Sequence, residues 1–306
     1  ASLPVKSLFT PVLPSQPSKS EIRALILSLF NTIFEPVQSE LLLLWLLGSL
    51  EENSRESQIL KGLFSLNFFG VTQETARLLY RLLQFLCTAI IYIPFNIPSL
   101  NTSSLRPSIV LHNLTPTPSF AAHESRFIID ETEMEVGTLT QTGIENVDFL
   151  AGLITNQIFQ YNYEGSNYEM HASSPVLVLS EKQSFLGNPN LGNANIQVVF
   201  PIGNVTPSEV NIDPAMLTVV RDYIENTRFT DFTISDEDQP LVSQSILDLL
   251  KSDIRPQQND LHTYMSILRL NCLSYGSASI TPEIIEETLG LFKLILPFIH
   301  PAEEQA

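Results

Sequence analysis

Ser108-Ile-Val-Leu-His112 and Arg126-Phe-Ile-Ile-Asp130 mark the place where the chain changes from a helical pattern to a strand pattern. Similar runs, rich in β-branched and aromatic residues, follow at Gln157–Tyr161, Pro175–Leu179 and Ile196–Phe200. Clusters of Gly, Pro, Asn and Ser separate these runs, as turns separate strands. Spacing of this kind predicts an antiparallel β-sandwich of about eight short strands. Residues 144–153 could instead form a helical turn within it.

Before this region, apolar residues recur at helical spacing. We expect a first helix to begin near Ser18–Ser20 and to end at Glu35-Pro36, because the residue before proline leaves the α region. Val37–Leu50 predicts a second helix that is apolar on every side. A third is expected over Ser54–Phe69, closed by Gly70. A fourth, capped by Thr72, is expected to reach about Ile93.

After the strand region the helical pattern returns. Asp213 is suited to an N-cap and Pro214 to the first helical position. Further helices are expected over residues 240–252 and 260–274, with Gly276 ending the latter, and a last one should run from Thr281 to Pro297.

The order of patterns predicts an α+β chain of two domains. A helical base would be built from residues 20–104 and 213–306. The antiparallel, jelly-roll-like sandwich would be an inserted domain at residues 105–212. Residues 1–19, with four prolines, predict an extended arm.

The net charge of −17, with 33 acidic and 16 basic residues, argues against direct nucleic-acid binding, which depends on Lys and Arg. Apolar residues make up 44% of the chain but charged residues only 16%. Because interface cores are depleted of charge, this balance favours an oligomer. The apolar runs are too short or too interrupted to predict a membrane span.

No nucleotide-binding, nucleophile-elbow or zinc-protease motif is present, so the sequence predicts neither an enzyme nor a cofactor or metal site. An enzyme would need a deep pocket with a titrating group of shifted pKa. The acids Asp236–Asp238 could bind a hard cation, or simply precede a helix whose dipole favours them. Cys87 and Cys272 lie in apolar helical patterns, typical of buried free thiols; a bridge between the helical segments is the alternative.

Two groups of residues are candidates for an interface. Leu41, Leu44 and Trp45 lie on the helix that is apolar on every side, which must be buried in the fold or between subunits. Tyr161, Tyr163 and Tyr168 flank Gly165-Ser166-Asn167. Tyrosine is favoured at interfaces, but these three could equally cover the sheet of a hairpin.

The order helix, sandwich, helix in a chain without catalytic motifs resembles one family. It is similar to the intermediate-layer coat proteins of reovirus-type double-stranded RNA viruses, such as the rotavirus inner-capsid and orbivirus core-surface proteins. In size it is nearer the seadornavirus branch. The resemblance covers about residues 20–300 and rests on order and composition, with no matched functional residue.

The resemblance implies a structural capsid protein of the virion, assembled in the host cytoplasm. Its homotrimers would tile a T=13 icosahedral layer, with the helical base on an inner-shell protein and the sandwich facing an outer-layer or spike protein. The alternative is a viral attachment or spike protein whose β module binds a receptor or glycan.

Overall fold

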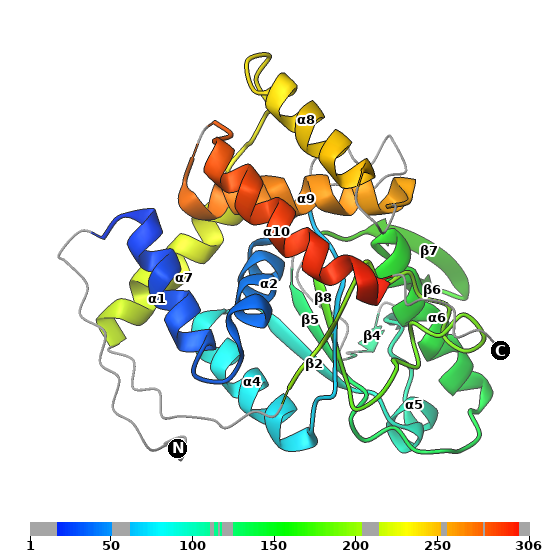
Figure 1. Cartoon of the computed structure of the whole chain (residues 1–306). Helices are drawn as coiled ribbons and strands as arrows, with labels where there is room; N and C mark the ends of the chain where they lie inside the picture. The colour runs from blue at the N-terminus through cyan, green and yellow to red at the C-terminus, as the bar shows by residue number, and fades with distance from the viewer. Residues whose placement is uncertain are drawn as a thin grey trace. The chain divides into compact units, whose positions relative to one another are not determined.

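The computed structural model describes residues 17–50, 62–110, 113–115, 117, 125–203, 214–251, 256–277 and 279–299 (Figure 1). The chain divides into two compact units. One, called the helical unit below, holds the described residues up to Phe64 and from Gln197 onward; the other, the sheet unit, is Ser65–Ile196. Both limits lie upstream of the sequence-based boundaries at residues 105 and 212.

The helical unit contains helices from both ends of the chain. They are α1 (Lys19–Phe30), α2 (Pro36–Leu47), α7 (Pro214–Arg228), α8 (Gln239–Leu250), α9 (Gln258–Tyr275) and α10 (Pro282–Ile299), with strand β9 (Val198–Pro201). α9 packs against α1, α2 and α10, and α7 packs against α1 and α2. Every residue of α2 from Leu41 to Leu47 is fully buried.

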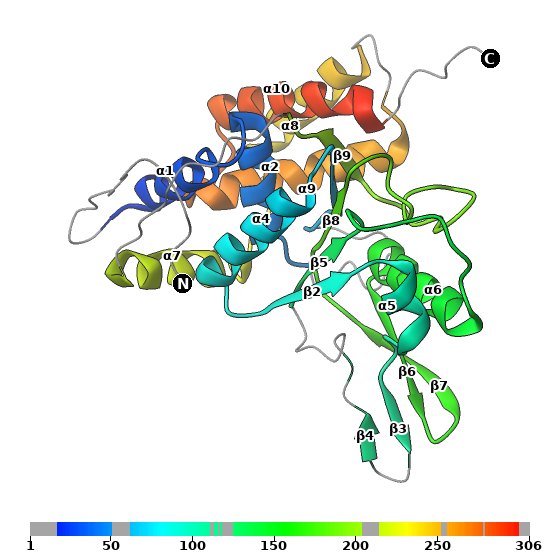
Figure 2. The same ribbon diagram turned by 90° about the horizontal axis from the view of Figure 1, so that it is seen from below.

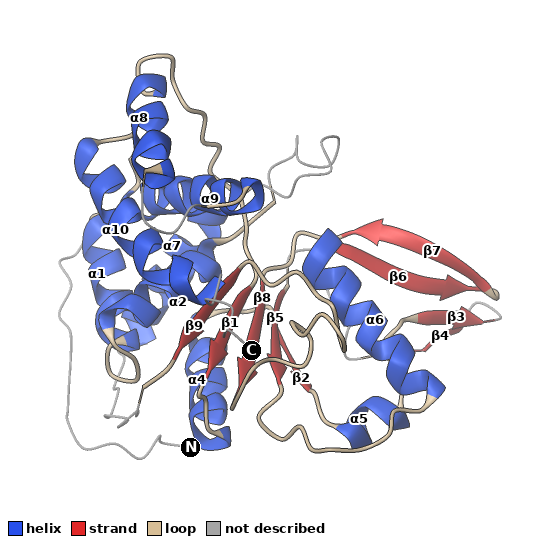
Figure 3. Ribbon diagram, turned by 45° about the vertical axis from the view of Figure 1, so that its right-hand side comes forward, coloured by secondary structure: helices blue, strands red, loops and turns tan. Residues whose placement is uncertain are grey.

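The sheet unit is built around parallel strands. Its elements are β1 (Leu66–Phe69), α4 (Gln73–Leu86), β2 (Ile90–Pro94), α5 (Ile97–Thr102), β3 (Ser108–Val110), β4 (Asn113–Thr115), β5 (Arg126–Asp130), α6 (Gln141–Asn156), β6 (Ile158–Tyr163), β7 (Ser166–His171) and β8 (Val176–Ser180). Within this unit β2, β5, β8 and β1 lie side by side in that order, all parallel. A smaller sheet has the order β4-β3-β6-β7 (Figure 3).

The core of the sheet unit lies where α5 and α6 meet the parallel strands. Every residue of β5 and β8 is buried. Such burial on both faces explains why these strands are apolar without alternation. Phe127 and Ile129 of β5 pack in one cluster with Phe149 of α6 and Phe159 of β6.

The described strands do not form the expected antiparallel jelly-roll sandwich. Their buried sheet is parallel, and the antiparallel pairs among them are β3–β4 and β6–β7. The strand positions were predicted well, but pairing direction was not. The continuous apolar run Val176–Leu179 is the feature typical of a parallel strand covered on both sides. The fold is α+β with a mostly parallel sheet.

Two predicted helices also need correction, and one ambiguous segment is settled. Leu66–Phe69 is a strand, followed by Gly70 at φ 80°, so this glycine follows β1 and closes no helix. Ile90–Pro94 is a strand as well, which shortens the fourth predicted helix to α4. Residues 144–153, ambiguous in sequence, lie inside the long helix α6. Pairing with β8 overrides the helical pattern at Leu66–Phe69, and at Ile90–Pro94 three β-branched isoleucines and pairing with β5 do so.

The helix caps were predicted more accurately. Ser18 caps α1 and accepts a hydrogen bond from the backbone N–H of Glu21. Gly276 ends α9 in the left-handed region at φ 70°, and α10 begins at Pro282. Cys87 and Cys272 are free and buried, as expected. Asp213, residues 54–61 and all but the end of the Pro-rich arm lie outside the described residues.

No helix in the described part of the chain is both long enough and apolar enough to cross a membrane.

Candidate interaction site

The three candidate tyrosines come together on one β-hairpin. β6 and β7 pair antiparallel in continuous register from Ile158↔His171 to Tyr163↔Ser166. The two-residue turn, Glu164-Gly165, has φ angles of 49° and 85°. Positive φ at both positions defines a type I′ turn, whose twist suits a hairpin. The structure therefore places the three tyrosines on a hairpin, and their role in an interface stays a prediction.

One face of this hairpin is aromatic along its whole length. At its base Phe159 is 5% exposed, and its ring lies 5.6 Å from that of Phe127, in the core. Further out, the rings of Tyr161 and Tyr168 stack at 5.6 Å, and Tyr163 meets Tyr168 edge-on at 6.2 Å. Figure 2 shows the hairpin extending away from α6 and the parallel strands.

The outer end of this face and its β7 side are exposed. Tyr163 is 39% exposed, Tyr168 47% and Met170, which pairs with Phe159, 51%, and every residue of β7 is exposed. Along β6 the face thus passes from the buried Phe159 to the exposed Tyr163. An exposed cluster of tyrosines with a methionine has the composition typical of a protein-binding surface.

The opposite face is polar and holds the hairpin's shape. The Asn162 amide donates to Asn167 Oδ1 at 3.1 Å, and Asn162 Oδ1 accepts from the backbone N–H of Gly165 at 3.0 Å. Gln160 accepts from the guanidinium of Arg106 at 2.9 Å, which ties β6 to the segment before β3. The tyrosines are consequently displayed on an ordered strand pair.

The other candidate interface residues occupy a different environment. Leu41, Leu44 and Trp45 belong to the helical unit and have no exposed surface. The sequence left open whether these residues are buried within the fold or between subunits. In the structure, packing within the chain accounts for their burial. The structure therefore brings the three tyrosines together with one another but not with the α2 residues.

A second candidate site lies at the carboxyl ends of the parallel strands. A cavity of about 740 Å³ is lined there by Glu131, Thr132, Ser180 and Lys182, among others. Open sheets of parallel strands bind ligands at this edge. Burial raises the pKa of Glu131 to about 7, while hydrogen bonds from Leu186, Phe185 and Ser184 oppose the rise. A pocket that contains a titrating group of shifted pKa is the feature that an enzyme would need.

Glu131, which lines the cavity, and the neighbouring Asp130 both accept hydrogen bonds from nearby groups of the unit. Glu131 accepts hydrogen bonds from Ser184 Oγ at 3.0 Å and from the backbone N–H groups of Phe185 and Leu186 at 2.8 and 3.0 Å. Asp130 accepts from the Tyr92 hydroxyl and, at 2.7 Å, from the Thr132 hydroxyl. These hydrogen bonds hold the segments around Thr132 and Ser184–Leu186 in place.

Sequence reasoning missed this pair, although the signal was present. Phe127-Ile-Ile-Asp-Glu131 is an apolar strand ending in two acids, the arrangement by which P-loop NTPases hold Mg²⁺. Such enzymes also need a glycine-rich loop with a lysine between a strand and a helix. Here β1 is joined to α4 by Gly70-Val71-Thr72, which contains no lysine. The phosphate-binding half of such a site is missing.

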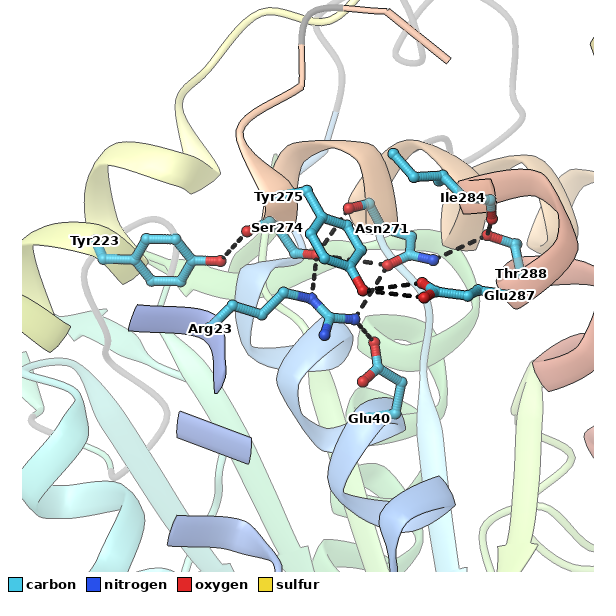
Figure 4. A network of polar contacts seen from close by, with 9 residues as sticks. All are labelled: Arg23, Glu40, Tyr223, Asn271, Ser274, Tyr275, Ile284, Glu287 and Thr288. Carbon is cyan, nitrogen blue, oxygen red and sulfur yellow. Dashed lines mark hydrogen bonds and ion pairs between the residues drawn. The ribbon is translucent and has the colours of Figure 1, made fainter. Parts of the chain in front are cut away.

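The polar network drawn in Figure 4 lies within the helical unit. Arg23 of α1 is 7% exposed, pairs with Glu40 of α2 and donates to Ser274 Oγ of α9 at 2.9 Å. Its guanidinium also lies 4.1 Å from the ring centroid of Tyr275. Burial raises the pKa of Glu40, and the charge of Arg23 opposes that shift. The network joins α1, α2 and α9, and it extends to Tyr223 of α7 and Thr288 of α10.

No group of three or more His, Cys, Asp or Glu side chains in the described part of the chain is placed to hold a metal ion. Asp236–Asp238 directly precede α8, where Ser235 Oγ donates to Asp238 at 2.7 Å and Gln239 donates to Asp236 at 3.0 Å.

Comparison with known proteins places the chain. A family model described as the Mini-chromosome maintenance replisome factor matches residues 7–288. The chain belongs to this family.

Curated relatives named Mini-chromosome maintenance complex-binding protein are similar to it. The relative from Drosophila melanogaster is 27% identical over 81% of the chain and 42% of its own length. Those from Danio rerio and Arabidopsis thaliana are both 26% identical, over 89% and 84% of the chain and 46% and 44% of their own lengths. The chain spans less than half of each relative.

The family membership overturns the resemblance to viral coat proteins. A replisome factor family with relatives in animals and a plant is not a reovirus-type coat protein. The predicted capsid function, homotrimer, T=13 layer, inner-shell and outer-layer or spike partners and virion location are therefore wrong, and so is the attachment-protein alternative. The physical reason lies in α2: its apolar residues are buried within the chain, so they are no sign of a capsid interface.

Proposed function

We propose that this chain is part of an MCM complex-binding protein and binds the Mini-chromosome maintenance (MCM) complex during DNA replication, in the nucleus of a eukaryotic cell. The observation that carries the proposal is the family match over residues 7–288, which runs through both units. The names of the relatives support it, because proteins from insects, fish and plants share the same described partner.

The proposed role is binding without catalysis and without a cofactor. Asp130 and Glu131, the acids closest to a catalytic arrangement, are engaged by Tyr92, Thr132 and the loop Ser184–Leu186. The net charge of −17 favours a protein surface over DNA as the partner. The exposed tyrosine face of β6–β7 supplies a surface of the required kind.

We further propose that the chain consists of two structural domains, a helical one formed from both chain ends and a strand-rich one between them. Support comes from the two compact units that divide after Phe64 and after Ile196. Limited proteolysis tests this: protected fragments should end near residues 64 and 196. Protected fragments that instead end near residues 104 and 212 would favour the sequence-based boundaries.

The binding proposal is tested with the purified chain and the purified MCM complex of the same organism. Co-elution in size-exclusion chromatography and a saturable signal in interferometry are the expected results. Labelled duplex DNA serves as the control ligand and should give no saturable binding at physiological salt. A chain that is folded by circular dichroism yet does not bind the complex would refute the proposal.

A further inference from the structure

We infer that the outer edge of β7 binds an extended, basic segment of the protein partner, which adds to the small sheet as a further strand. This inference rests on the proposed function, since it specifies how the chain contacts another protein. The site consists of the β7 backbone at Asn167, Glu169 and His171 together with the side chains of Tyr168 and Met170.

The hairpin register fixes which backbone groups of β7 point outward. In an antiparallel pair, residues alternate between pairs that exchange hydrogen bonds and pairs that do not. A two-residue turn makes Tyr163↔Ser166 a bonded pair, and the bond from Ala172 N–H to Gln157 C=O, at 2.8 Å, extends the same alternation. Asn167, Glu169 and His171 therefore direct their N–H and C=O groups away from β6.

This edge has little of the protection that sheet edges usually carry. Natural edges are shortened, bulged, or guarded by proline and lysine. β7 has six residues, pairs with β6 without a bulge and contains neither proline nor lysine. It is the last strand of its sheet in the described part of the chain, and all six residues are exposed. An open edge of this length is the template used in recognition by strand addition.

The tyrosine face would give an added strand its side-chain contacts. Tyr168 and Met170 stand on β7 next to the open edge, and both are about half exposed. Alternate side chains of an added strand would lie on the same face as this pair. Apolar or long aliphatic side chains at those positions would cover Tyr168 and Met170 and remove them from water.

The charge of the hairpin indicates the chemistry of the occupant. Residues 158–171 include Glu164 and Glu169 but no lysine or arginine, and the whole chain carries −17. A partner segment bearing lysine or arginine is therefore complementary to this edge. A second copy of the chain fits poorly, because an antiparallel β7–β7 pair would bring two Glu169 side chains and two strongly acidic molecules together.

Two substitutions at one position separate the backbone from the side chain. Glu169→Pro removes an outward N–H at an edge position, where proline is tolerated by the sheet. Glu169→Ala removes the same charge but keeps the N–H. We expect Glu169→Pro to weaken binding of the MCM complex by about tenfold or more and Glu169→Ala by much less. Tyr168→Ser should also weaken it, since it removes the aromatic surface beside the edge.

A peptide of alternating lysine and valine probes the edge directly. With hydrogen exchange as the readout, the peptide and the MCM complex should each protect the amides of Asn167, Glu169 and His171 in the unaltered chain. In Glu169→Pro the peptide should protect none of them. Circular dichroism and the melting temperature of each variant report whether the fold is retained, and Glu169→Ala should match the unaltered chain in both.

The outcomes distinguish the two proposals. If the complex does not bind but the peptide protects β7, the proposed function fails and the strand-addition site stands. If the complex binds the unaltered chain and Glu169→Pro equally well, and the peptide gives no protection, the strand-addition site is refuted and the function stands. A dimer of the free chain that Glu169→Pro abolishes would overturn the basic partner in favour of a second copy.

Discussion

β7 and β8 are separated by only four residues, yet their environments are opposite. All five residues of β8, Val-Leu-Val-Leu-Ser, are buried, whereas all six of β7, Ser-Asn-Tyr-Glu-Met-His, are exposed. β8 is apolar at four consecutive positions, as a strand covered on both faces must be. β7 alternates polar residues with Tyr168 and Met170, so it offers one apolar face that the described residues of its unit leave exposed. The difference separates the residues that hold the sheet unit together from those free to bind.

The largest expected effect comes from placing a charge in the buried sheet. Ile128 of β5 is fully buried between the parallel neighbours β2 and β8. Ile128→Asp should abolish folding of the sheet unit, because an unpaired carboxylate there costs several kcal/mol. Far-UV circular dichroism and protease resistance would measure this.

Tyr168→Asp is the matched control, since it places the same charge on the exposed hairpin and should leave the fold intact. An Ile128→Asp chain with an unchanged melting temperature would show that β5 is not at the centre of the unit.

Phe159 tests the point where the buried and exposed parts of the aromatic face meet. Its ring packs on those of Phe127 and Phe149 at 5.6 and 5.9 Å. Phe159→Ala should lower the free energy of unfolding by roughly 3–5 kcal/mol, the usual cost of emptying an aromatic site in a core.

Tyr163→Ala, on the same face but exposed, should cost less than about 1 kcal/mol. Urea unfolding of both variants gives the comparison directly. Equal losses would mean that the hairpin is packed along its whole length.

How far the sequence predicted this fold depends on the physics of each feature. Ser18, Gly276 and Pro282 act locally, through caps and fixed φ angles, so α1, α9 and α10 could be placed from the sequence. Val176–Leu179 was recognised as a strand, but its parallel pairing depends on long-range contacts that periodicity does not encode. The apolar pattern before Leu66–Phe69 is helical, so the sequence predicts a helix there. Its pairing with the distant strand β8 makes it a strand.

In the candidate site, too, local features could be predicted from the sequence, whereas features that depend on long-range contacts could not. The tyrosines at residues 161, 163 and 168 stood out by composition, and the pair Glu164-Gly165 was available as a turn signal. The open edge of β7 could not be foreseen, because edges follow from sheet order. Trp45 and its neighbours were apolar enough to suggest an interface, but their burial in the chain depends on packing with segments far away in sequence.

Glu131, at the end of the buried strand β5, should make the free energy of unfolding depend on pH. Its pKa is raised by burial to about 7 from the usual 4.5. Between these values the folded chain holds a proton that the unfolded chain has released. The contribution of Glu131 to the free energy of unfolding is therefore fully present below pH 4.5, falls as the pH rises through this interval, and has lost about 3 kcal/mol above pH 7.

Glu131→Gln is the matched variant, because glutamine has the same shape and does not titrate in this range. The difference in unfolding free energy between the two chains, measured in urea at pH 5 and pH 8, should change by that amount. A difference that is the same at both pH values would mean that Glu131 is ionised throughout.

The smallest effect is expected in the hairpin turn, and it tests whether an exposed strand pair needs its own local geometry. Gly165 has φ 85°, and a Cβ added there would have nothing within 4 Å. Gly165→Ala should therefore cost about 1 kcal/mol through backbone strain alone, and only in the hairpin.

Glu164→Asn provides the opposite change, because Asn-Gly is the preferred pair in a type I′ turn. Amide exchange at Tyr161 and Tyr168, which form a hydrogen-bonded pair of the hairpin, should become faster in Gly165→Ala and slower in Glu164→Asn, while the amides of β8 are unaffected. A change in β8 exchange would mean that hairpin and core unfold together, and the contrast between the two strands would then be one of exposure but not of stability.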